Sequence, residues 1–573
     1  MSRHVDDLAV IAAPTDQVSD VIARMAEGAT RHFGLALVIE DGRLVGLFND
    51  GDVLRLLASN GDLERPVATV MTPDPITVAE GSNDEQVLTH VRARVWERTG
   101  GARDLVKYVP VVDTRERVVD VIDTIRLLSR SRPHGEHVEV HGLGFVGLTL
   151  AVALASRGHV VRGIDTDTEL VARLGQRDPH VFEPRLAEML AQGLQSMALS
   201  ISADAPETAM RVVVVAVGTP VDADGEVDDR ALRTAVEGVG PRLRQGTLVL
   251  LRSTVPVGTT RSLVIPLLES ASNLRAGRDF HIAFTPERTV EGQAMRELAT
   301  LPQIVGGLTD SCASAAANFW LTLTDSVVHV DSLEAAELVK LTNNSFRDLS
   351  FAFANGLALL ADRYNIDANR LITAANEGYP RNPVPCPSPG VGGYCLSKDP
   401  HLYASVEREA GHARLAKTGR DVNVQAAQYP VAVVERYAGR LGREVSELRV
   451  LVVGVAFKGW PATNDVRESS SLEVLATLQI RGCETRAFDA IVDDERIHRL
   501  GVQPVELLEG ASWADAIVVM NNHPDNIPEG LLSQLQGRNV LLFDGWAMLD
   551  RHEVEDYPQV TYATLGYMTP ESH

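Results

Sequence analysis

The sequence predicts an α/β protein in which two doubly wound parallel-sheet domains are joined by a long central helix and preceded by a smaller α+β unit. Three observations carry this prediction. Apolar runs such as residues 211–220 are typical of strands buried on both faces of a parallel sheet. A strand, a glycine-rich turn and a helix follow one another near residues 138–165 and again near 449–489. The 573 residues suffice for about four domains of ~150 residues.

Composition limits the functions that the chain can have. Apolar residues make up 45% and charged residues 23%, as in ordinary globular proteins. The formal net charge is −23, which argues against broad binding of nucleic acid or of an anionic membrane, because both need a basic surface. We find no signal peptide, no apolar stretch of about 18 residues, no disulfide framework and no zinc-like cysteine spacing, so we expect a cytoplasmic protein without a metal site.

Residues 1–130 form a unit of two similar halves, each with helical and strand patterns in the same order. The unit resembles a pair of cystathionine-β-synthase-type (CBS) domains. The residues that carry the resemblance are Val70–Pro73, Gly46–Asp52 and Val109–Asp113. Residues 131–137, which include a proline and a glycine, are predicted to be a linker.

In the CBS family, a Thr/Ser-x-x-Asp motif places its carboxylate on the ribose of an adenosine nucleotide. Here Asp52 holds the acidic place, and Asn49 stands where Thr or Ser is usual. The second half, at Val121–Thr124, matches the motif poorly. The resemblance therefore implies at most one adenosine nucleotide site, and a role in packing or assembly is the alternative.

The first large domain, residues 138–330, begins with a strand that runs into Gly142-x-Gly144-x-x-Gly147 and an apolar helix. The glycines allow a tight turn and close approach of a pyrophosphate, and the helix N-terminus attracts the anion. Asp165 follows about 20 residues later, where a carboxylate can accept from both ribose hydroxyls. This carboxylate would repel a 2′-phosphate, so the sequence predicts a Rossmann-like NAD site. Its other predicted members are Phe145, Val146, Thr219 and Thr254.

Two segments carry the candidate chemistry. The long helix predicted from Ser332 to Tyr364 contains Lys340 and Asn344, which share one face and can hold a developing oxyanion. Glycines precede Cys395, while Lys398 and Asp399 follow it. A glycine-rich approach leaves room for a substrate carbon, and a nearby ammonium favours the nucleophilic thiolate.

Residues 137–565 resemble the UDP-glucose/GDP-mannose dehydrogenase family, the nucleotide-sugar 6-dehydrogenases. The motifs that carry this resemblance, in chain order, are GLGFVGLTLA, VGTPVDADG, STVPVGT, FTPERTVEG, AELVKLTNNSF, PGVGGYCLSKDP and VGVAFKGWPATNDVRESSS. The resemblance implies oxidation of a sugar C6 alcohol to a carboxylate with two NAD, for polysaccharide or glycan precursor synthesis.

The resemblance also implies a role for each site residue. A water held by Thr254 and Asp399, with help from Lys340, takes the alcohol proton. Cys395 then attacks the aldehyde, and Lys340 and Asn344 hold the oxyanion of the thiohemiacetal before a thioester forms.

Glu287 acts as the base or the orienting group in the hydrolysis of this thioester. Residues 331–430 form the central domain, which implies a homodimer or a higher homo-oligomer. The residues implied in substrate binding are Glu287, Glu291, Lys340, Asn344, Gly392, Lys458 and Arg467.

The C-terminal domain, residues 431–573, repeats the order of strand, glycine loop (Gly454–Gly459), helix and strand. In the family this domain binds the nucleotide diphosphate, and Lys458 and Arg467 match its basic positions. A salt bridge from Arg467 to Asp465 or Glu468 is the alternative.

The motifs conflict over the sugar. The loop at residues 287–292 resembles the N-acetylhexosamine branch, whereas Cys395-x-x-Lys398-Asp399 is closer to the glucose type. Trp546 stands where many members have an arginine. Two further hypotheses remain: a nucleotide-sensing regulatory protein on a decayed dehydrogenase, and a two-electron hydroxyacid dehydrogenase, which would need neither Cys395 nor the second nucleotide domain.

Overall fold

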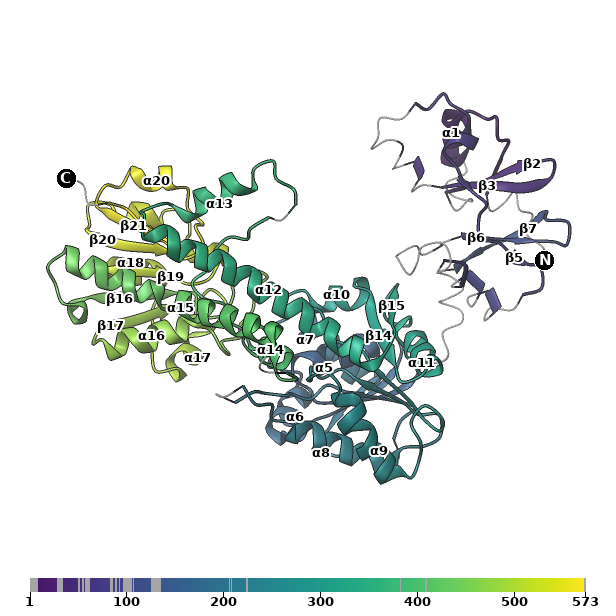
Figure 1. The fold of residues 1–573 in the computed structure, drawn as a ribbon, viewed down its shortest axis with the longest axis horizontal. Coiled ribbons are helices and arrows are strands. Elements are labelled where there is room, and N and C mark those ends of the chain that lie inside the picture. The colour runs from purple at the N-terminus through teal and green to yellow at the C-terminus, as the bar shows by residue number, and fades with distance from the viewer. Residues whose placement is uncertain are drawn as a thin grey trace. The chain divides into compact units, whose positions relative to one another are not determined.

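The computed structural model divides the chain into two units, residues 1–135 and residues 136–573 (Figure 1). The division falls within the segment predicted as a linker, whose residues 131–134 lie outside the described residues. The structure describes residues 9–27, 34–49, 52–53, 56, 62–82, 86–87, 90–91, 93–95, 106, 108–124, 135–205, 207, 209–222, 225–381, 383–407 and 410–570.

The N-terminal unit contains two small sheets with the same arrangement. In each, a short strand runs parallel to a longer strand, which pairs antiparallel with the next strand through an irregular register. The first sheet has the order β1-β2-β3-β4, with strands Val10–Ala12, Leu35–Glu40, Arg43–Asn49 and Thr72–Pro73. The second has the order β5-β6-β7, with strands Val78–Ala79, Tyr108–Val112 and Val118–Asp123.

One hydrophobic cluster joins the two halves of this unit. Leu35, Leu37 and Leu47 of the first half are buried against Tyr108 and Val121 of the second. Helix α1 (Val18–Glu27) packs its apolar side on the first sheet, and η2 (Val67–Thr69) follows. Of the predicted motif at Gly46–Asp52, residues 50 and 51 lie outside the described residues.

The first large domain is built on an eight-stranded sheet of order β10-β9-β8-β11-β12-β13-β14-β15. All neighbours are parallel except β13 and β14. The strands are β8 (His137–His141), β9 (Val160–Ile164), β10 (Leu199–Ser202), β11 (Val212–Val215), β12 (Leu248–Leu251), β13 (His281–Phe284), β14 (Gln303–Gly307) and β15 (Val327–Val330).

Helices cover both faces of this sheet (Figure 1). They are α5 (Phe145–Ser156), α6 (Thr168–Gly175), α7 (Leu186–Gln195), α8 (Arg230–Val239), η3 (Gly240–Arg242), η4 (Thr260–Val264), α9 (Ile265–Ser272), α10 (Ala294–Thr300) and α11 (Asp310–Trp320). Strand order reverses between β8 and β11, and ligands bind at such a switch point in open parallel sheets.

The central helix is α12 (Leu333–Asp362), which confirms the prediction to within two residues at each end. It begins where Ser332 accepts a hydrogen bond from the Ala335 amide at 3.1 Å, an ordinary N-cap. It packs against two further helices, α14 (Tyr394–Ala404) and α15 (Gly411–Arg440), while α13 (Ala368–Asn376) follows it.

The C-terminal domain has a seven-stranded sheet of order β18-β17-β16-β19-β20-β21-β22, with a switch between β16 and β19. Its strands are β16 (Arg449–Val453), β17 (Glu484–Phe488), β18 (Gln503–Pro504), β19 (Ala516–Val519), β20 (Val540–Asp544), β21 (Val560–Thr564) and β22 (Tyr567–Met568). Its helices are η5 (Val445–Glu447), α16 (Ser470–Ile480), α17 (Asp494–Arg499), α18 (Leu507–Trp513), η6 (Pro524–Asn526), α19 (Leu531–Gln534) and α20 (Arg551–Glu555).

The predicted fold class is therefore confirmed: two Rossmann-like sheets joined by a long helix and preceded by a smaller α+β unit. Among the described helices, none combines the length and the apolar character that crossing a bilayer requires.

Candidate active site

The glycine loop after β8 has the geometry of a dinucleotide cradle. Gly142 has a φ of +87°, and a Cβ on it would lie 2.8 Å from the Ala216 carbonyl oxygen. A Cβ on Gly147 would lie 1.8 Å from the Gly142 oxygen, so only glycine allows α5 to start this close to the turn. Gly144, the N-cap of α5, faces open space. These residues fit the pyrophosphate of NAD.

The other predicted NAD residues surround this loop. Phe145 and Val146 open α5, whose amides point to the cradle. Asp165 follows β9, and its Oδ2 accepts from the Leu143 amide at 2.7 Å, so the carboxylate is attached to the cradle. Thr219 donates to the Thr254 carbonyl oxygen at 2.5 Å and thereby joins the loops after β11 and β12. The Thr254 hydroxyl makes no hydrogen bond to the described residues.

A row of polar side chains follows one face of α12. Lys340 is 8% exposed and makes no hydrogen bond or ion pair to the residues that the structure describes. One turn earlier, Glu337 is 1% exposed and accepts from the Gly258 amide at 2.5 Å and the Thr260 amide at 2.8 Å. One turn later, Asn344 donates to Asp399 Oδ2 at 2.5 Å. A buried ammonium kept without a partner is costly, and such groups concentrate at functional sites.

Cys395 lies in the first turn of α14, after Gly393, whose φ is +89°. A Cβ on Gly393 would lie 2.6 Å from the Phe457 ring, and one on Gly392 would lie 2.5 Å from the Glu468 carbonyl oxygen. These glycines thus let the loop before Cys395 press against the C-terminal domain. Close behind the cysteine, Lys398 Nζ lies 3.0 Å from Asp399 Oδ1, an ion pair in which both side chains are buried.

Four charges act on the Cys395 thiol. Desolvation raises its pKa most strongly, Lys340 and Lys398 lower it, and Asp399 and Glu291 raise it. The net pKa is raised. As expected from the sequence, each nearby ammonium favours the thiolate. Burial and the two carboxylates nevertheless raise the pKa by more than the two lysines lower it.

Glu287 is buried next to the site and is held by Arg252. Its Oε2 accepts from Arg252 Nε at 2.9 Å and also from Nη2, and its Oε1 accepts from the Thr289 amide at 2.6 Å. Burial raises the pKa of Glu287. Arg252, Thr289 and Lys340 together lower it by more than burial raises it, so the net pKa is lowered. A carboxylate with a lowered pKa is a weak base, which favours the orienting role over the basic one.

Arg252 was not predicted from the sequence. It is 1% exposed, donates to Gln303 Oε1 at 3.1 Å and lies 4.6 Å from the centre of the Trp320 ring. A charged residue at the end of the apolar run 247–251 is the signal that could have indicated it.

The C-terminal domain brings its basic residues to the same region. Lys458 Nζ donates to the Glu291 carbonyl oxygen at 2.7 Å, and desolvation lowers the pKa of this ammonium. Arg467 makes a bidentate ion pair with Asp465, with a shortest distance of 2.6 Å, and lies 5.2 Å from the centre of the Tyr394 ring. The alternative interpretation of Arg467, a salt bridge to Asp465, is thus confirmed.

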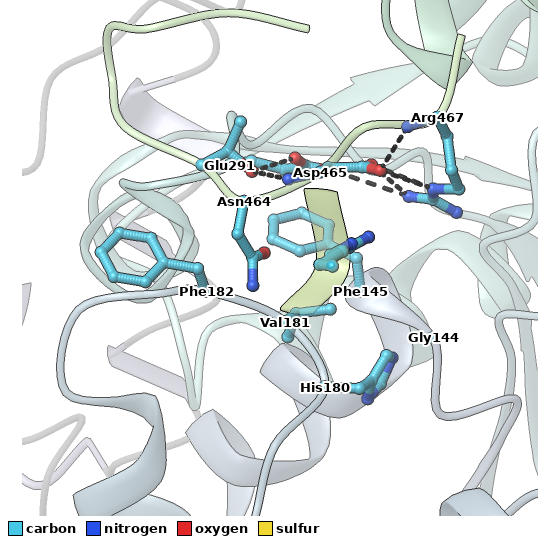
Figure 2. A pocket seen from close by; sticks show the side chains of 11 residues that line it. Gly144, Phe145, His180, Val181, Phe182, Glu291, Asn464, Asp465 and Arg467 are labelled. Atoms are coloured by element: carbon cyan, nitrogen blue, oxygen red, sulfur yellow. Dashed lines mark hydrogen bonds and ion pairs between the residues drawn. The ribbon is translucent and has the colours of Figure 1, made fainter. Parts of the chain in front are cut away.

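Both domains line a cavity of about 200 Å³ (Figure 2). Gly144, Phe145 and the segment 180–182 come from the first domain, and 463–465 and Arg467 come from the C-terminal domain. Glu291 lies beside Asp465 in Figure 2, and its Oε2 accepts from Thr463 at 3.0 Å. The NAD cradle, the Arg467 guanidinium and the loop of Glu291 therefore border one space.

The indole N–H of Trp546 already has a hydrogen-bond acceptor within the C-terminal domain. Its Nε1 donates to the Met520 carbonyl oxygen at 3.0 Å, and its own amide donates to Asp544.

Family models match nearly all of the second unit. The NAD binding domain of the UDP-glucose/GDP-mannose dehydrogenase family matches residues 136–324, its central domain residues 334–425 and its UDP binding domain residues 451–551. A CBS domain matches residues 1–59.

Curated relatives and solved structures agree. A UDP-N-acetyl-D-mannosamine dehydrogenase of Pyrococcus horikoshii is 32% identical over 389 residues, which cover 68% of this chain and 90% of the relative. An NDP-N-acetyl-D-galactosaminuronic acid dehydrogenase of Ralstonia solanacearum is 33% identical, covering 67% and 90%. A UDP-glucose dehydrogenase structure from Pyrobaculum islandicum has a TM-score of 0.66 and 29% identity, covering 76% and 99%.

A dinucleotide cradle at the switch point of one Rossmann-like sheet, which borders one cavity with Glu291 and Arg467, indicates an NAD-dependent oxidoreductase. The sequence likeness extends through all three domains of the second unit and makes the class specific. The chain belongs to the UDP-glucose/GDP-mannose dehydrogenase family and is a nucleotide-sugar dehydrogenase with an N-terminal CBS domain.

Proposed function

We propose that the protein oxidises the C6 hydroxyl of a UDP-hexose or UDP-N-acetylhexosamine to the uronic acid in two oxidations at one site. The observation that carries the proposal is the buried Lys340 ammonium, which has no partner among the described residues and acts directly on the Cys395 thiol. Gly142, Gly144 and Gly147 would hold NAD, which would supply the hydride acceptor for both oxidations.

In the first oxidation, the residues of the chain remove the hydroxyl proton. A water between Thr254 and Asp399 takes this proton, and Lys340 stabilises the developing alkoxide by its charge. Asp399 suits this role because Asn344 fixes its Oδ2 and Lys398 balances its charge. The product of this step is the C6 aldehyde.

In the second oxidation, the Cys395 thiol gives its proton to a water in the site, its sulfur adds to the aldehyde carbon, and the carbonyl oxygen becomes an oxyanion. The Lys340 ammonium and the Asn344 amide hold this oxyanion. Loss of the remaining C6 hydride gives a thioester. A water oriented by Glu287 then adds to the thioester carbonyl, the C–S bond breaks, and the thiol and the carboxylate are released.

The nucleotide is held by the C-terminal domain in this proposal. Arg467 leaves Asp465 for the diphosphate, and Lys458 adds a second positive charge. The named relatives act on UDP-N-acetyl-D-mannosamine and on UDP-glucose, which supports a UDP-sugar. The loop at residues 287–292 favours the N-acetylhexosamine branch.

The test is the yield of NADH with UDP-glucose, UDP-GlcNAc, UDP-ManNAc and GDP-mannose in turn. The proposal predicts two NADH per sugar for the true substrate, and loss of the uronic acid product in Cys395→Ala. One NADH per sugar in the wild type, or an unchanged product in Cys395→Ala, would contradict it. Cys386→Ala is the matched control, because this thiol hydrogen-bonds to Asn369 and Trp546, outside the proposed machinery.

We also propose that the enzyme is a homodimer formed through α12. Phe346, Phe353 and Leu360 recur every seven residues, lie on one helix face and are 73%, 64% and 53% exposed. Such a row of large apolar side chains is unusual on a free surface and suits a second copy of the same helix. Phe353→Glu should give a monomer by light scattering, whereas a wild-type monomer would refute the proposal.

For the N-terminal unit we propose one adenosine nucleotide site at Asp52. The carboxylate is 7% exposed and accepts from the Asn49 amide at 2.9 Å, which places it at the start of the helical segment at residues 52–53. AMP, ATP or S-adenosylmethionine should raise the melting temperature of the wild type but not of Asp52→Ala. No shift with any of the three would favour the packing role.

A further inference from the structure

Three helices meet at a buried polar network behind the Cys395 loop. Asp348 of α12 is fully buried, and its Oδ1 accepts from Arg420 Nη1 at 2.6 Å and from Asn423 Nδ2 at 2.9 Å, both on α15. Asp348 follows Asn344 by one helical turn, so this network continues the polar row of Glu337, Lys340 and Asn344.

Arg420 extends from this pair to the backbone on both sides of the nucleophile. Its Nη1 donates to the carbonyl oxygens of Val391 and Leu396, each at 3.4 Å, and its Nη2 also donates to Val391 at 3.4 Å. Leu396 is the residue that follows Cys395, and Val391 lies at the start of its glycine turn. The guanidinium thus bridges the two ends of the segment that carries the thiol.

A second branch of the network holds the loop further upstream. Asn423 Oδ1 accepts from Asn355 Nδ2 at 2.9 Å, and Asn355 Oδ1 accepts from the Ser388 amide at 2.8 Å. All three side chains are at most 1% exposed. Because buried polar groups without partners are costly, this chain of bonds allows the loop few alternative positions.

We propose that Arg420, oriented by Asp348, is a positioning residue that fixes the Cys395 sulfur relative to Lys340 and Asn344. The loop needs such support because it contains Gly390, Gly392 and Gly393, whose backbones are intrinsically flexible. The planar fork of arginine holds its five N–H donors in fixed directions toward a carboxylate and two carbonyls, whereas the lysine ammonium is a point charge without this fixed geometry. The inference depends on the proposed function in that Cys395 is taken as the nucleophile.

The decisive variant is Arg420→Lys, which keeps the charge opposite Asp348 but loses the bridge between the two carbonyls. Its matched control is Arg436→Lys. Arg436 is on the same helix and pairs with Asp362 of α12 at 2.9 Å, but it makes no hydrogen bond or ion pair to the described residues of the Cys395 loop. A merely structural arginine-to-lysine effect would appear in both variants.

The readout is the rate at which iodoacetamide alkylates Cys395 in the full-length protein across a pH series. The extent of alkylation is measured by mass spectrometry of the peptide that contains Cys395. This rate reports the sulfur directly and requires no turnover, so it separates failure of this inference from failure of the proposed function. Arg420→Lys should change the rate at least about tenfold, with kcat falling similarly and KM for the sugar nucleotide little changed. Arg436→Lys should match the wild type.

A wild-type alkylation rate and kcat in Arg420→Lys, or equal changes in Arg436→Lys, would overturn the inference. Asp348→Asn keeps the size and the oxygen acceptor of the side chain and serves if Arg420→Lys does not fold. It should change the alkylation rate in the same direction by a smaller factor, and an unchanged rate in this folded variant would also overturn the inference.

Discussion

At the residue scale, the reactivity of Cys395 depends on a balance among its neighbours. Lys340 and Lys398 favour the thiolate, while burial and the carboxylates of Asp399 and Glu291 favour the thiol. The resting cysteine is therefore protonated at neutral pH to a greater extent than a free cysteine. When the substrate aldehyde excludes water from the site, the Cys395 thiol must lose its proton before its sulfur can add to the aldehyde carbon.

This balance predicts the effect of Asp399→Asn on the thiol. Removing the carboxylate removes a cause that raises the pKa, so the alkylation rate of Cys395 should rise to its plateau at lower pH than in the wild type. The measurement is the pH profile of iodoacetamide modification between about pH 6 and pH 10. Cys386 is the internal control. Desolvation and Asp544 raise the pKa of this thiol to about 11, and Asp399 is not among the causes of that shift. A shift of Cys395 to higher pH would contradict the prediction.

Two glycines of the cradle predict opposite phenotypes. Gly147→Ala places a Cβ 1.8 Å from the Gly142 oxygen and should lower the free energy of unfolding by about 1–3 kcal/mol or more. Gly144→Ala meets nothing within 4 Å and should leave the melting temperature unchanged, but it should weaken NAD binding because its methyl occupies space for the pyrophosphate. Melting curves and a fluorescence titration with NAD check both. Equal destabilisation by the two variants would refute the assignment.

At the element scale, α12 is joined to the segment of Thr254 by a buried carboxylate. Glu337 accepts from the Gly258 and Thr260 amides, at the start of η4. Desolvation raises the pKa of Glu337, so this carboxylate tolerates burial only because three donors reach it, the third being the Thr260 hydroxyl at 2.6 Å. The contact fixes where the loop after β12 lies relative to Lys340.

Glu337→Ala should lower the free energy of unfolding by about 2 kcal/mol or more, because it leaves the half-buried Gly258 amide and the buried Thr260 amide and hydroxyl without their acceptor. Glu334→Ala is the matched control. Glu334 is one turn earlier and joins the same two elements through Arg261 at 2.5 Å, but this pair is partly exposed and should contribute about 0–1 kcal/mol. Denaturant unfolding of both variants tests the difference, and equal losses would contradict it.

The elements themselves were largely predictable. Continuous apolar runs at 212–215 and 450–453 define buried parallel strands, and the start of α12 follows from its serine cap and its helical period. Cys395, Lys340 and Asn344 lie in short motifs that the chain order preserves. Arg420 and Asp348 were not predicted, because they are 72 residues apart and meet only through the packing of α15 on α12. The net pKa of Cys395 likewise depends on residues from three segments.

At the scale of the whole molecule, the chain comprises two units with separate cores. Within the described residues of 1–135, the hydrophobic clusters are built from side chains of this unit. The family models for the dehydrogenase begin at residue 136, so the second unit holds every residue of the proposed site. The N-terminal CBS domain lies outside the residues that match the dehydrogenase family models.

A chain of residues 136–573 should therefore fold and retain kcat within about twofold of the full-length protein when no adenosine nucleotide is added. The check is the NADH assay on both chains, together with their melting curves. An insoluble or inactive product would show that the first unit is required for the stability or the assembly of the second.

The polar row on α12 also bears on how this enzyme can diverge. Glu337, Asn344 and Asp348 each contact a different segment, and Lys340 lies between them on the same face, so all four depend on the rotation of one helix about its axis. A substitution that turned this helix would disturb every segment together. New sugar preferences should therefore arise in the segments at 180–182 and 463–464, which border the cavity and contain none of the proposed catalytic residues. Libraries aimed at a different nucleotide sugar should vary these segments and leave the buried face of α12 intact.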